Sequence, residues 1–383
     1  MKKQLLSTSA IALGVAFAAP ASAQEWNMDW GGFYDSHVGY VTVDSNTAAQ
    51  AGADFDGVDV FTDAEIHFTP SVTLDNGLTF GINVQYEALN AGGGADGIDE
   101  SYLSISGDTL GRIDLGAENS AGYKMSIGAP QVSGGIDINS PWVSGFVPIS
   151  IAAGGNLPFA FRDSGISSYA EVLGNNDVQR ITYYTPSFNG LTLGVSYAAN
   201  AAGNAVNNFG VNRNAGVTDV FDIGLAYSQS FNGVDVDFAA RWGTAESNVV
   251  GTSDPEVWNI GLNVGFNGFV IGGGYGENDN GGLRAWDSEG WSLGVTYDIA
   301  GPWSVGFDTY QGEYSGIGAA SGDKAEYEAY QLVGSRSLGA GVTWAVYAAY
   351  VEGSVNADVG ATFGNANTTV EGTVIGTSVN LSF

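Results

Sequence analysis

Residues 180–197 read RITYYTPSFNGLTLGVSY, which predicts one strand, one tight turn and a second strand. Asn189 and Gly190 both tolerate positive φ, so an Asn-Gly pair between two alternating runs is a strong hairpin signal. The same unit recurs at Phe231-Asn232-Gly233 and Phe266-Asn267-Gly268, and in weaker form at Asp75-Asn76-Gly77. The chain therefore consists of repeated antiparallel hairpins, and the edges of the resulting sheet have to be closed or covered.

The N-terminus predicts a secretory signal peptide. Lys2 and Lys3 precede an apolar run over residues 10–19, which is followed by the small-residue motif Ala21-Ser22-Ala23. We expect cleavage before Gln24, which leaves a signal peptide over residues 1–23 and one mature domain over residues 24–383. The mature protein is thus expected to leave the cytoplasm.

The composition favours many short strands and excludes several classes of function. Glycine accounts for 58 of 383 residues and aromatic residues for 12%, whereas cysteine is absent, so no disulfide holds the fold. A net charge of −30 makes nucleic acid an unsuitable partner, because the phosphate backbone is itself anionic. After the signal peptide, no apolar run approaches the roughly 18 residues that a spanning helix needs.

Tight turns and long polar loops alternate along the chain, which predicts an up-and-down meander with all tight turns at one end. Sixteen strands are predicted, at residues 30–43, 61–74, 78–89, 98–108, 111–118, 178–187, 191–199, 219–230, 234–244, 256–266, 269–277, 284–299, 302–313, 325–337, 341–352 and 369–383.

The strand faces predict a membrane location. Along residues 256–266, Trp258, Ile260 and Leu262 alternate with small and polar residues, and the strands exceed the usual five or six residues. Aromatic residues gather at the strand ends, as in the girdles of transmembrane barrels. Lipid cannot satisfy backbone hydrogen bonds, so such a sheet has to close on itself. Sixteen strands leave a water-filled lumen.

Taken in order, four stretches resemble the general Gram-negative outer-membrane porin family, and its alphaproteobacterial members most closely. They are GGFY at residues 31–34, DTLGRIDLG at 108–116, QRITYYTPSFNG at 179–190 and VNLSF at 379–383. The resemblance implies a homotrimer of sixteen-stranded barrels in the outer membrane, through which ions and small hydrophilic solutes diffuse passively. It also implies that the barrel assembly machinery recognises the terminal Phe383.

The resemblance further implies that a long third loop, here residues 119–177, folds into the lumen and narrows it. Four of the nine prolines lie in this loop, which suits an irregular but fixed backbone. The alternative to this arrangement is an extra hairpin at residues 134–138 and 145–152, which would give eighteen strands.

The candidate pore-lining residues are mostly acidic. The loop offers Asp137, Asp163, Glu171 and Asp177, and the facing strands carry Asp35, Asp63, Glu65, Glu87 and Glu100, whereas the inward-facing basic residues are Arg112, Arg180 and Arg241. Family members usually oppose a basic cluster to the acidic loop, but this chain has no Lys or Arg between residues 4 and 111. A lumen lined mainly with carboxylates predicts a preference for cations.

A calcium site is a weaker candidate. Asp54, Asp56 and Asp59 place three carboxylates in one short loop, and oxygen-rich loops suit Ca²⁺, but a solvated acidic loop is the better explanation. His37 and His67, the two histidines, belong to no set of three or four metal ligands. We expect neither a metal nor an organic cofactor.

An enzyme is the main alternative class. Residues 290–294 spell G-x-S-x-G, but the hydrolase elbow needs a strand-turn-helix and a later histidine, and no histidine follows His67. We therefore expect no catalytic residues. The alternatives to a porin are an outer-membrane barrel enzyme, a plugged receptor barrel and a secreted β-rich binding module.

Overall fold

The computed structural model describes residues 25–47, 50–89, 97–136, 138, 146–149, 171–201, 210–283, 287–299, 301–315, 324–355 and 368–383. The predicted signal peptide, Asp137 and Asp163 lie outside the described residues, as does much of the predicted third loop.

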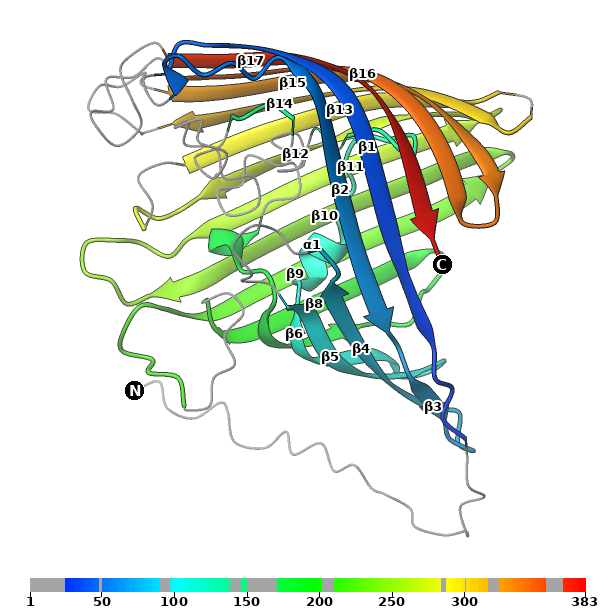
Figure 1. Ribbon diagram of the computed structural model, residues 1–383. Helices are drawn as coiled ribbons and strands as arrows, with labels where there is room; N and C mark the ends of the chain where they lie inside the picture. Colours follow the sequence, from blue (N-terminus) through cyan, green and yellow to red (C-terminus); the bar gives the residue numbers. More distant parts are fainter. Residues whose placement is uncertain are drawn as a thin grey trace.

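The described residues contain seventeen strand segments, which form one closed antiparallel sheet (Figure 1). The segments are β1 (Trp30–Ser45), β2 (Gly57–Phe68), β3 (Ser71–Thr73), β4 (Thr79–Glu87), β5 (Ile98–Gly107), β6 (Gly111–Glu118), β7 (Val178–Tyr184), β8 (Leu191–Asn200), β9 (Val217–Phe231), β10 (Val234–Ser247), β11 (Glu256–Phe266), β12 (Phe269–Asp279), β13 (Asp287–Asp298), β14 (Trp303–Ser315), β15 (Lys324–Gly339), β16 (Val342–Val355) and β17 (Thr368–Ser382).

The barrel closes because β1 pairs with both β2 and β17. The strands β2 and β3 are successive segments that both pair with β4, separated by Thr69 and Pro70. Pro70 has no amide hydrogen to donate to the ladder, which accounts for the interruption. The wall is therefore sixteen-stranded with one strand split in two, and the predicted fold class is confirmed. None of the described residues in the region of the alternative hairpin lies in a strand.

The hairpin turns have the backbone conformation that their sequences predict. Asn189, Asn232 and Asn267 have φ values of 47°, 52° and 49°, and the glycine after each has a φ of 82–83°. Two consecutive residues with positive φ match the twist of the flanking strands. These turns set the register, so that Phe266, for example, lies directly opposite Phe269 across the turn between β11 and β12.

Each strand has one inner and one outer face. In β13, Trp291 and Leu293 are exposed on the outer face, whereas Gly290 and Ser292 are buried on the inner face. Aromatic side chains lie on the outer face towards the long connections, and they include Trp258, Tyr275, Trp291, Tyr330 and Tyr350. An apolar outer surface with an aromatic rim suits contact with lipid.

A row of carboxylates continues the outer face beyond these aromatic residues. These rim carboxylates are Glu277, Glu289, Glu313, Glu326, Glu328, Glu352 and Glu371. Glu289 lies directly opposite Glu277 on one side and opposite Glu313 on the other. The Tyr275 hydroxyl donates to Glu277 at 2.6 Å and lies 3.0 Å from Glu289. Like charges thus face each other across successive strand pairs, and Lys324 forms ion pairs with Glu313 and Glu326 in this row.

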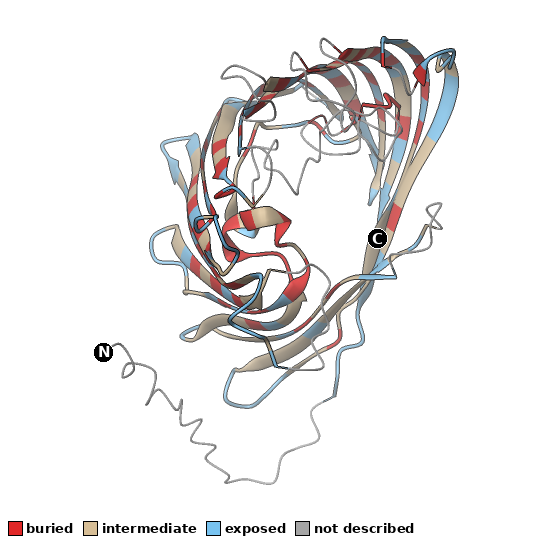
Figure 2. Cartoon of the chain, turned by 90° about the vertical axis from the view of Figure 1, so that its left-hand side faces the viewer, coloured by how far each residue is buried: buried red, intermediate tan, exposed pale blue. Residues whose placement is uncertain are grey.

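The core lies between the inner face of the wall and the described part of the third loop. Figure 2 shows α1 (Ala121–Met125) inside the ring of strands. No helix among the described residues is long and apolar enough to cross a membrane. Beyond α1, the buried loop side chains of Ile136, Ile138, Phe146 and Val147 join one apolar cluster with inner-wall residues such as Tyr327.

Candidate functional site: the lumen wall and the third loop

The start of the third loop is tied to the wall by hydrogen bonds from its backbone. The Ser120 hydroxyl caps α1 by accepting from the Tyr123 amide at 3.2 Å. The next two amides donate to wall side chains, Ala121 to Ser196 Oγ at 2.7 Å and Gly122 to Asp222 Oδ1 at 2.6 Å. Because the first amides of a helix have no partner within it, the wall supplies the acceptors that α1 lacks.

Two inward arginines lie beneath this part of the loop. Arg241 forms an ion pair with Asp222, and both side chains are 1% exposed. Arg180 donates from Nε to the carbonyl of Glu118 at 2.6 Å and from Nη2 to the backbone and side-chain oxygens of Asn175. Arg180 and Arg241 are each only 5% exposed. The structure thus places these predicted pore-lining residues between wall and loop, Arg241 in an ion pair and Arg180 hydrogen-bonded to oxygens of Glu118 and Asn175.

The other inward cations are also paired. Arg112 donates from Nε to Asp114 at 2.8 Å, although its side chain remains 44% exposed to the lumen. Lys124 lies 2.8 Å from Glu118 and 3.5 Å from Glu100. Burial lowers the pKa of the Lys124 ammonium, but these two carboxylates outweigh that effect, so its pKa is raised and it stays charged.

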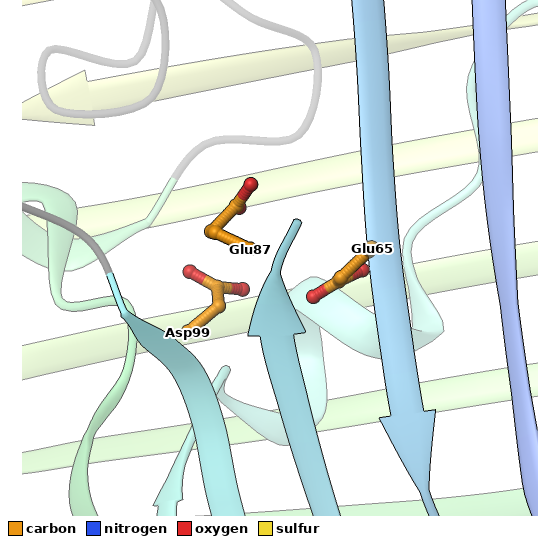
Figure 3. Close-up of side chains that lie close together, drawn as sticks. All are labelled: Glu65, Glu87 and Asp99. Carbon is orange, nitrogen blue, oxygen red and sulfur yellow. The ribbon is translucent and has the colours of Figure 1, made fainter. Parts of the chain in front are cut away.

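A cluster of three carboxylates lies on the lumen side of β2, β4 and β5. Glu65 is directly opposite Glu87 in the strand register, and Asp99 lies beside them (Figure 3). One oxygen from each of the three lies within 4.8 Å of the others, and all three residues are half-buried. His67 is hydrogen-bonded to Glu65 at 2.9 Å. We name Glu65, Glu87 and Asp99 the lumen carboxylates.

Four further predicted carboxylates lie on the wall or at the end of the loop. Asp35 on β1 lies directly opposite Asp63 on β2, and both are half-buried. Glu100 is 3% exposed and accepts from the Asn119 amide at 3.0 Å. Glu171 is 1% exposed, and its carbonyl accepts from Asn278 at 3.0 Å. The structure therefore brings together the acidic candidates of β1, β2, β4 and β5, whereas Glu171 holds the returning end of the loop.

The calcium candidates lie elsewhere: Asp54 and Asp56 are on the connection between β1 and β2, and Asp59 is near the start of β2. Asp54, Asp56 and Asp59 are exposed. Asp56 accepts from the Val43 amide at 2.8 Å, and Asp54 accepts from the Asp56 amide at 3.0 Å. Within the described ranges, these three carboxylates do not converge as Glu65, Glu87 and Asp99 do.

The serine of the G-x-S-x-G stretch and the buried histidine both contact the loop. Ser292 faces inwards and accepts from the Ala129 amide at 3.0 Å. His37 is 6% exposed, hydrogen-bonded to the Tyr347 hydroxyl at 3.2 Å, with its ring 6.5 Å from that of Phe146.

Sequence reasoning missed Asp99 and Asp222 as site residues. Asp222 lies on the inward phase of β9, so alternation alone could have marked it as a wall residue facing the loop. Asp99 follows the glycine-rich connection before β5, where a shift in register between β4 and β5 obscures the phase.

The arrangement can attract and orient ions rather than transform a substrate. The paired cations contribute little net charge, whereas the lumen carboxylates and the Asp35–Asp63 pair leave the wall of β1, β2, β4 and β5 acidic. In cation channels, rings of acidic side chains favour cations.

Comparisons with known proteins agree with this architecture. A family model described as Gram-negative porin matches residues 7–356. An anion-selective porin from Comamonas acidovorans is 16% identical, with a TM-score of 0.61 over 94% of this chain and 100% of that chain. The channel DcaP of Acinetobacter baumannii is 11% identical, with a TM-score of 0.59 over 96% and 100% of the chains.

The trimer form of in-vitro folded OmpT of Vibrio cholerae is 11% identical, with a TM-score of 0.57 over 94% of this chain and 99% of that chain. No curated protein matches the sequence. At these identities, the solved structures establish a likeness in fold.

Proposed function

Because the chain belongs to the Gram-negative porin family, it is an outer-membrane channel, and we propose that it conducts cations in preference to anions. One observation carries the proposal: Glu65, Glu87 and Asp99 converge on the lumen side of the wall, while Arg180 and Arg241 are buried under the loop. The similar Comamonas porin is anion-selective, so selectivity has to come from the side chains and not from the shared fold.

The test is the reversal potential of the purified channel in a planar bilayer under a salt gradient. The reversal potential of the wild type is expected to have the sign of a cation-selective channel. The triple variant Glu65→Gln, Glu87→Gln, Asp99→Asn removes three lumen charges and is expected to shift the reversal potential towards zero.

The matched control is Glu277→Gln, Glu289→Gln, Glu313→Gln, which removes three charges from the outer rim. It is expected to keep the wild-type reversal potential. If the wild type prefers anions, the proposal is wrong. If both triple variants shift the potential equally, net charge rather than lumen position determines the selectivity.

Transport is proposed to be passive diffusion of ions and small hydrophilic solutes, without a catalytic step. Ser292, the serine of the G-x-S-x-G stretch, lies at 5% exposure and accepts a hydrogen bond from the loop backbone. No histidine follows it in the chain, so the elements of a hydrolase triad are not assembled around it. This supports a channel without an attached hydrolytic activity.

The channel is further proposed to be a homotrimer in which the outer faces of the first and last strands meet a neighbouring subunit. These faces expose Tyr34 and Val38 of β1 and Ile375 and Val379 of β17. On the adjacent β2, Val58 and Val60 are 67% and 69% exposed and carry the apolar face towards the long connections. The trimeric form of the similar OmpT structure is consistent with this assembly.

The C-terminal residue is proposed to be recognised by the barrel assembly machinery. Phe383 is 69% exposed, while its backbone pairs with Gly32 through hydrogen bonds of 3.0 and 3.1 Å. The terminal ring is thus available while its backbone completes the closing strand pair. The signal peptide over residues 1–23 is proposed to direct export.

A further inference from the structure

Several inward-facing glycines lie directly behind the described part of the third loop. On Gly294, a Cβ atom would lie 2.7 Å from the carbonyl oxygen of Pro130, and on Gly306 it would lie 2.6 Å from Val132 Cγ2. On Gly261 it would overlap the carbonyl oxygen of Ile127. We name as track glycines the eight wall glycines whose Cβ would lie within 3.0 Å of loop residues 121–149: Gly39, Gly194, Gly224, Gly261, Gly274, Gly294, Gly306 and Gly372.

Where the wall lacks such a glycine, the loop supplies it. On β15 and β16 the wall presents larger side chains, Gln331 and Ala345. The facing loop residues there are Gly134 and Gly135. A Cβ on Gly134 would lie 2.6 Å from Ala345 Cβ, and one on Gly135 would lie 2.6 Å from Gln331 Oε1. The loop therefore also lies close to the wall at β15 and β16. There, the glycines that permit the close contact belong to the loop and not to the wall.

Hydrogen bonds fix the loop at intervals along the same path. After Ser196 and Asp222, which hold α1, Ser292 on β13 accepts from the Ala129 amide. Asp308 on β14 accepts from Gln131 Nε2 at 3.0 Å. Ser378 on β17 donates to the Gly134 carbonyl at 2.6 Å. Each contact joins an inward side chain to a residue near a track position.

A short distance to the loop distinguishes the track glycines from other inward-facing strand glycines. Gly265 lies on β11 with the same inward phase as Gly261, but a Cβ there would meet nothing closer than 3.4 Å. Glycine inside a strand costs stability relative to alanine, because it loses more backbone freedom on folding. Repeating that cost on many strands is explained if the missing side chains make room for the loop.

We infer that the track glycines, together with Gly134 and Gly135, are positioning residues that seat the third loop against the wall and thereby set the bore of the channel. The inference rests on the channel function stated above. A side chain at a track position would push the loop backbone off the wall and towards the lumen axis. The same side chain at an inward position away from the loop would leave the bore unchanged.

The first experiment compares Gly261→Ala with Gly265→Ala by single-channel conductance in planar bilayers. Gly261→Ala is expected to lower the conductance, because its Cβ overlaps the loop backbone, whereas Gly265→Ala is expected to match the wild type. Folding of each variant is checked by the shift in gel migration on heating. Equal conductance of folded Gly261→Ala and wild type would overturn the inference, while a wild type that does not conduct would instead overturn the channel function.

The second experiment places the loop without relying on conductance. The chain has no cysteine, so the pair Val132→Cys and Gly306→Cys provides its sole thiols. The Cβ of Val132 lies 3.4 Å from a Cβ built on Gly306, close to the roughly 3.5–4.5 Å that disulfides span. Val132→Cys also removes the Cγ2 atom that a Cβ on Gly306 would meet at 2.6 Å, so the pair is expected to form a disulfide on oxidation of the folded barrel.

The control pair is Val132→Cys with Gly265→Cys, which is expected to keep both thiols free. A folded Val132→Cys, Gly306→Cys variant whose thiols remain free under oxidation would overturn the seating of the loop. An equal yield of disulfide from both pairs would do so as well, because it would mean that the loop samples many positions.

Discussion

Asp222 and Arg241 illustrate how charged residues can stabilise a channel without adding net charge to its lumen. The guanidinium neutralises a carboxylate that also accepts from the Gly122 amide, and both side chains are 1% exposed. Two charges in such a place are tolerable only as a pair, because an isolated buried charge loses its hydration without compensation. The pair therefore connects β9, β10 and the start of the third loop.

Arg241→Met should be strongly destabilising, because it leaves the Asp222 carboxylate buried without its counterion. Breaking a buried pair from one side costs roughly 3–5 kcal/mol. The measurement is the free energy of unfolding from urea titration in detergent, followed by tryptophan fluorescence. Asp219→Asn is the control, since the Arg213–Asp219 pair is exposed at 53% and 25% and is expected to contribute much less to stability than the buried pair. Similar losses in the two variants would contradict this account.

Alternation along a strand predicts which way a side chain points but not what covers it. The inward phases of Arg180 and Arg241 follow from their strands, and both residues do lie on the inner face. Their burial depends on Asn175, Glu118 and Asp222 and on the path of the loop. Those partners are distant in sequence or lie in irregular backbone. Irregular backbone has no periodic sequence pattern from which these contacts could be predicted.

The strands and turns follow closely from local sequence. The predicted bounds 111–118 and 256–266 coincide with β6 and β11, and the Asn-Gly turns adopt the expected conformation. The split between β2 and β3 at Pro70 was not predicted, although the proline itself was a readable signal. The path of the third loop could not be predicted from local sequence, because a contact such as that of Ser378 with Gly134 joins residues 244 positions apart.

The rim carboxylates predict that salt stabilises this sheet. Directly opposed like charges cost about 0.2–1 kcal/mol each, and added salt screens them. The thermal midpoint of the wild type is therefore expected to rise with ionic strength. Glu289→Gln should flatten this dependence, because it removes the repulsion from both Glu277 and Glu313. Gln311→Glu, which faces Glu328, should steepen it. A thermal midpoint that falls with salt in all three proteins would contradict this explanation.

The polarity of the outer face differs around the circumference of the closed barrel. Outward positions near the long connections are acidic from β12 to β17, but on β2 they are the apolar Val58 and Val60. On β2, the apolar outer surface extends as far towards the long connections as the rim carboxylates do on the other strands. Such a surface suits burial against another protein more than contact with polar lipid headgroups. This asymmetry is the physical basis for placing the subunit contact at β1, β2 and β17.

Val60→Arg is expected to convert the proposed trimer to monomers, because it would bury a charge in the proposed subunit contact. Light scattering in detergent measures the assembly and should give three times the chain mass for the wild type. Ile260→Arg places the same charge on the outer face of β11 and is expected to leave the trimer intact. A monomeric wild type would refute the assembly, and a trimeric Val60→Arg would move the contact elsewhere.

The seat of the third loop also constrains the order of folding. Residues 121–149 contact His37 and Gly39 on β1, but most of their wall contacts, from Gly194 to Ser378, are with residues that follow the loop in the chain. The last of these positions are in place only once β17 has joined the sheet, and β17 in turn closes the barrel on β1. The loop therefore cannot reach its final position along a growing sheet. A newly closed barrel has a wide bore first, and it acquires its constriction only when the loop docks.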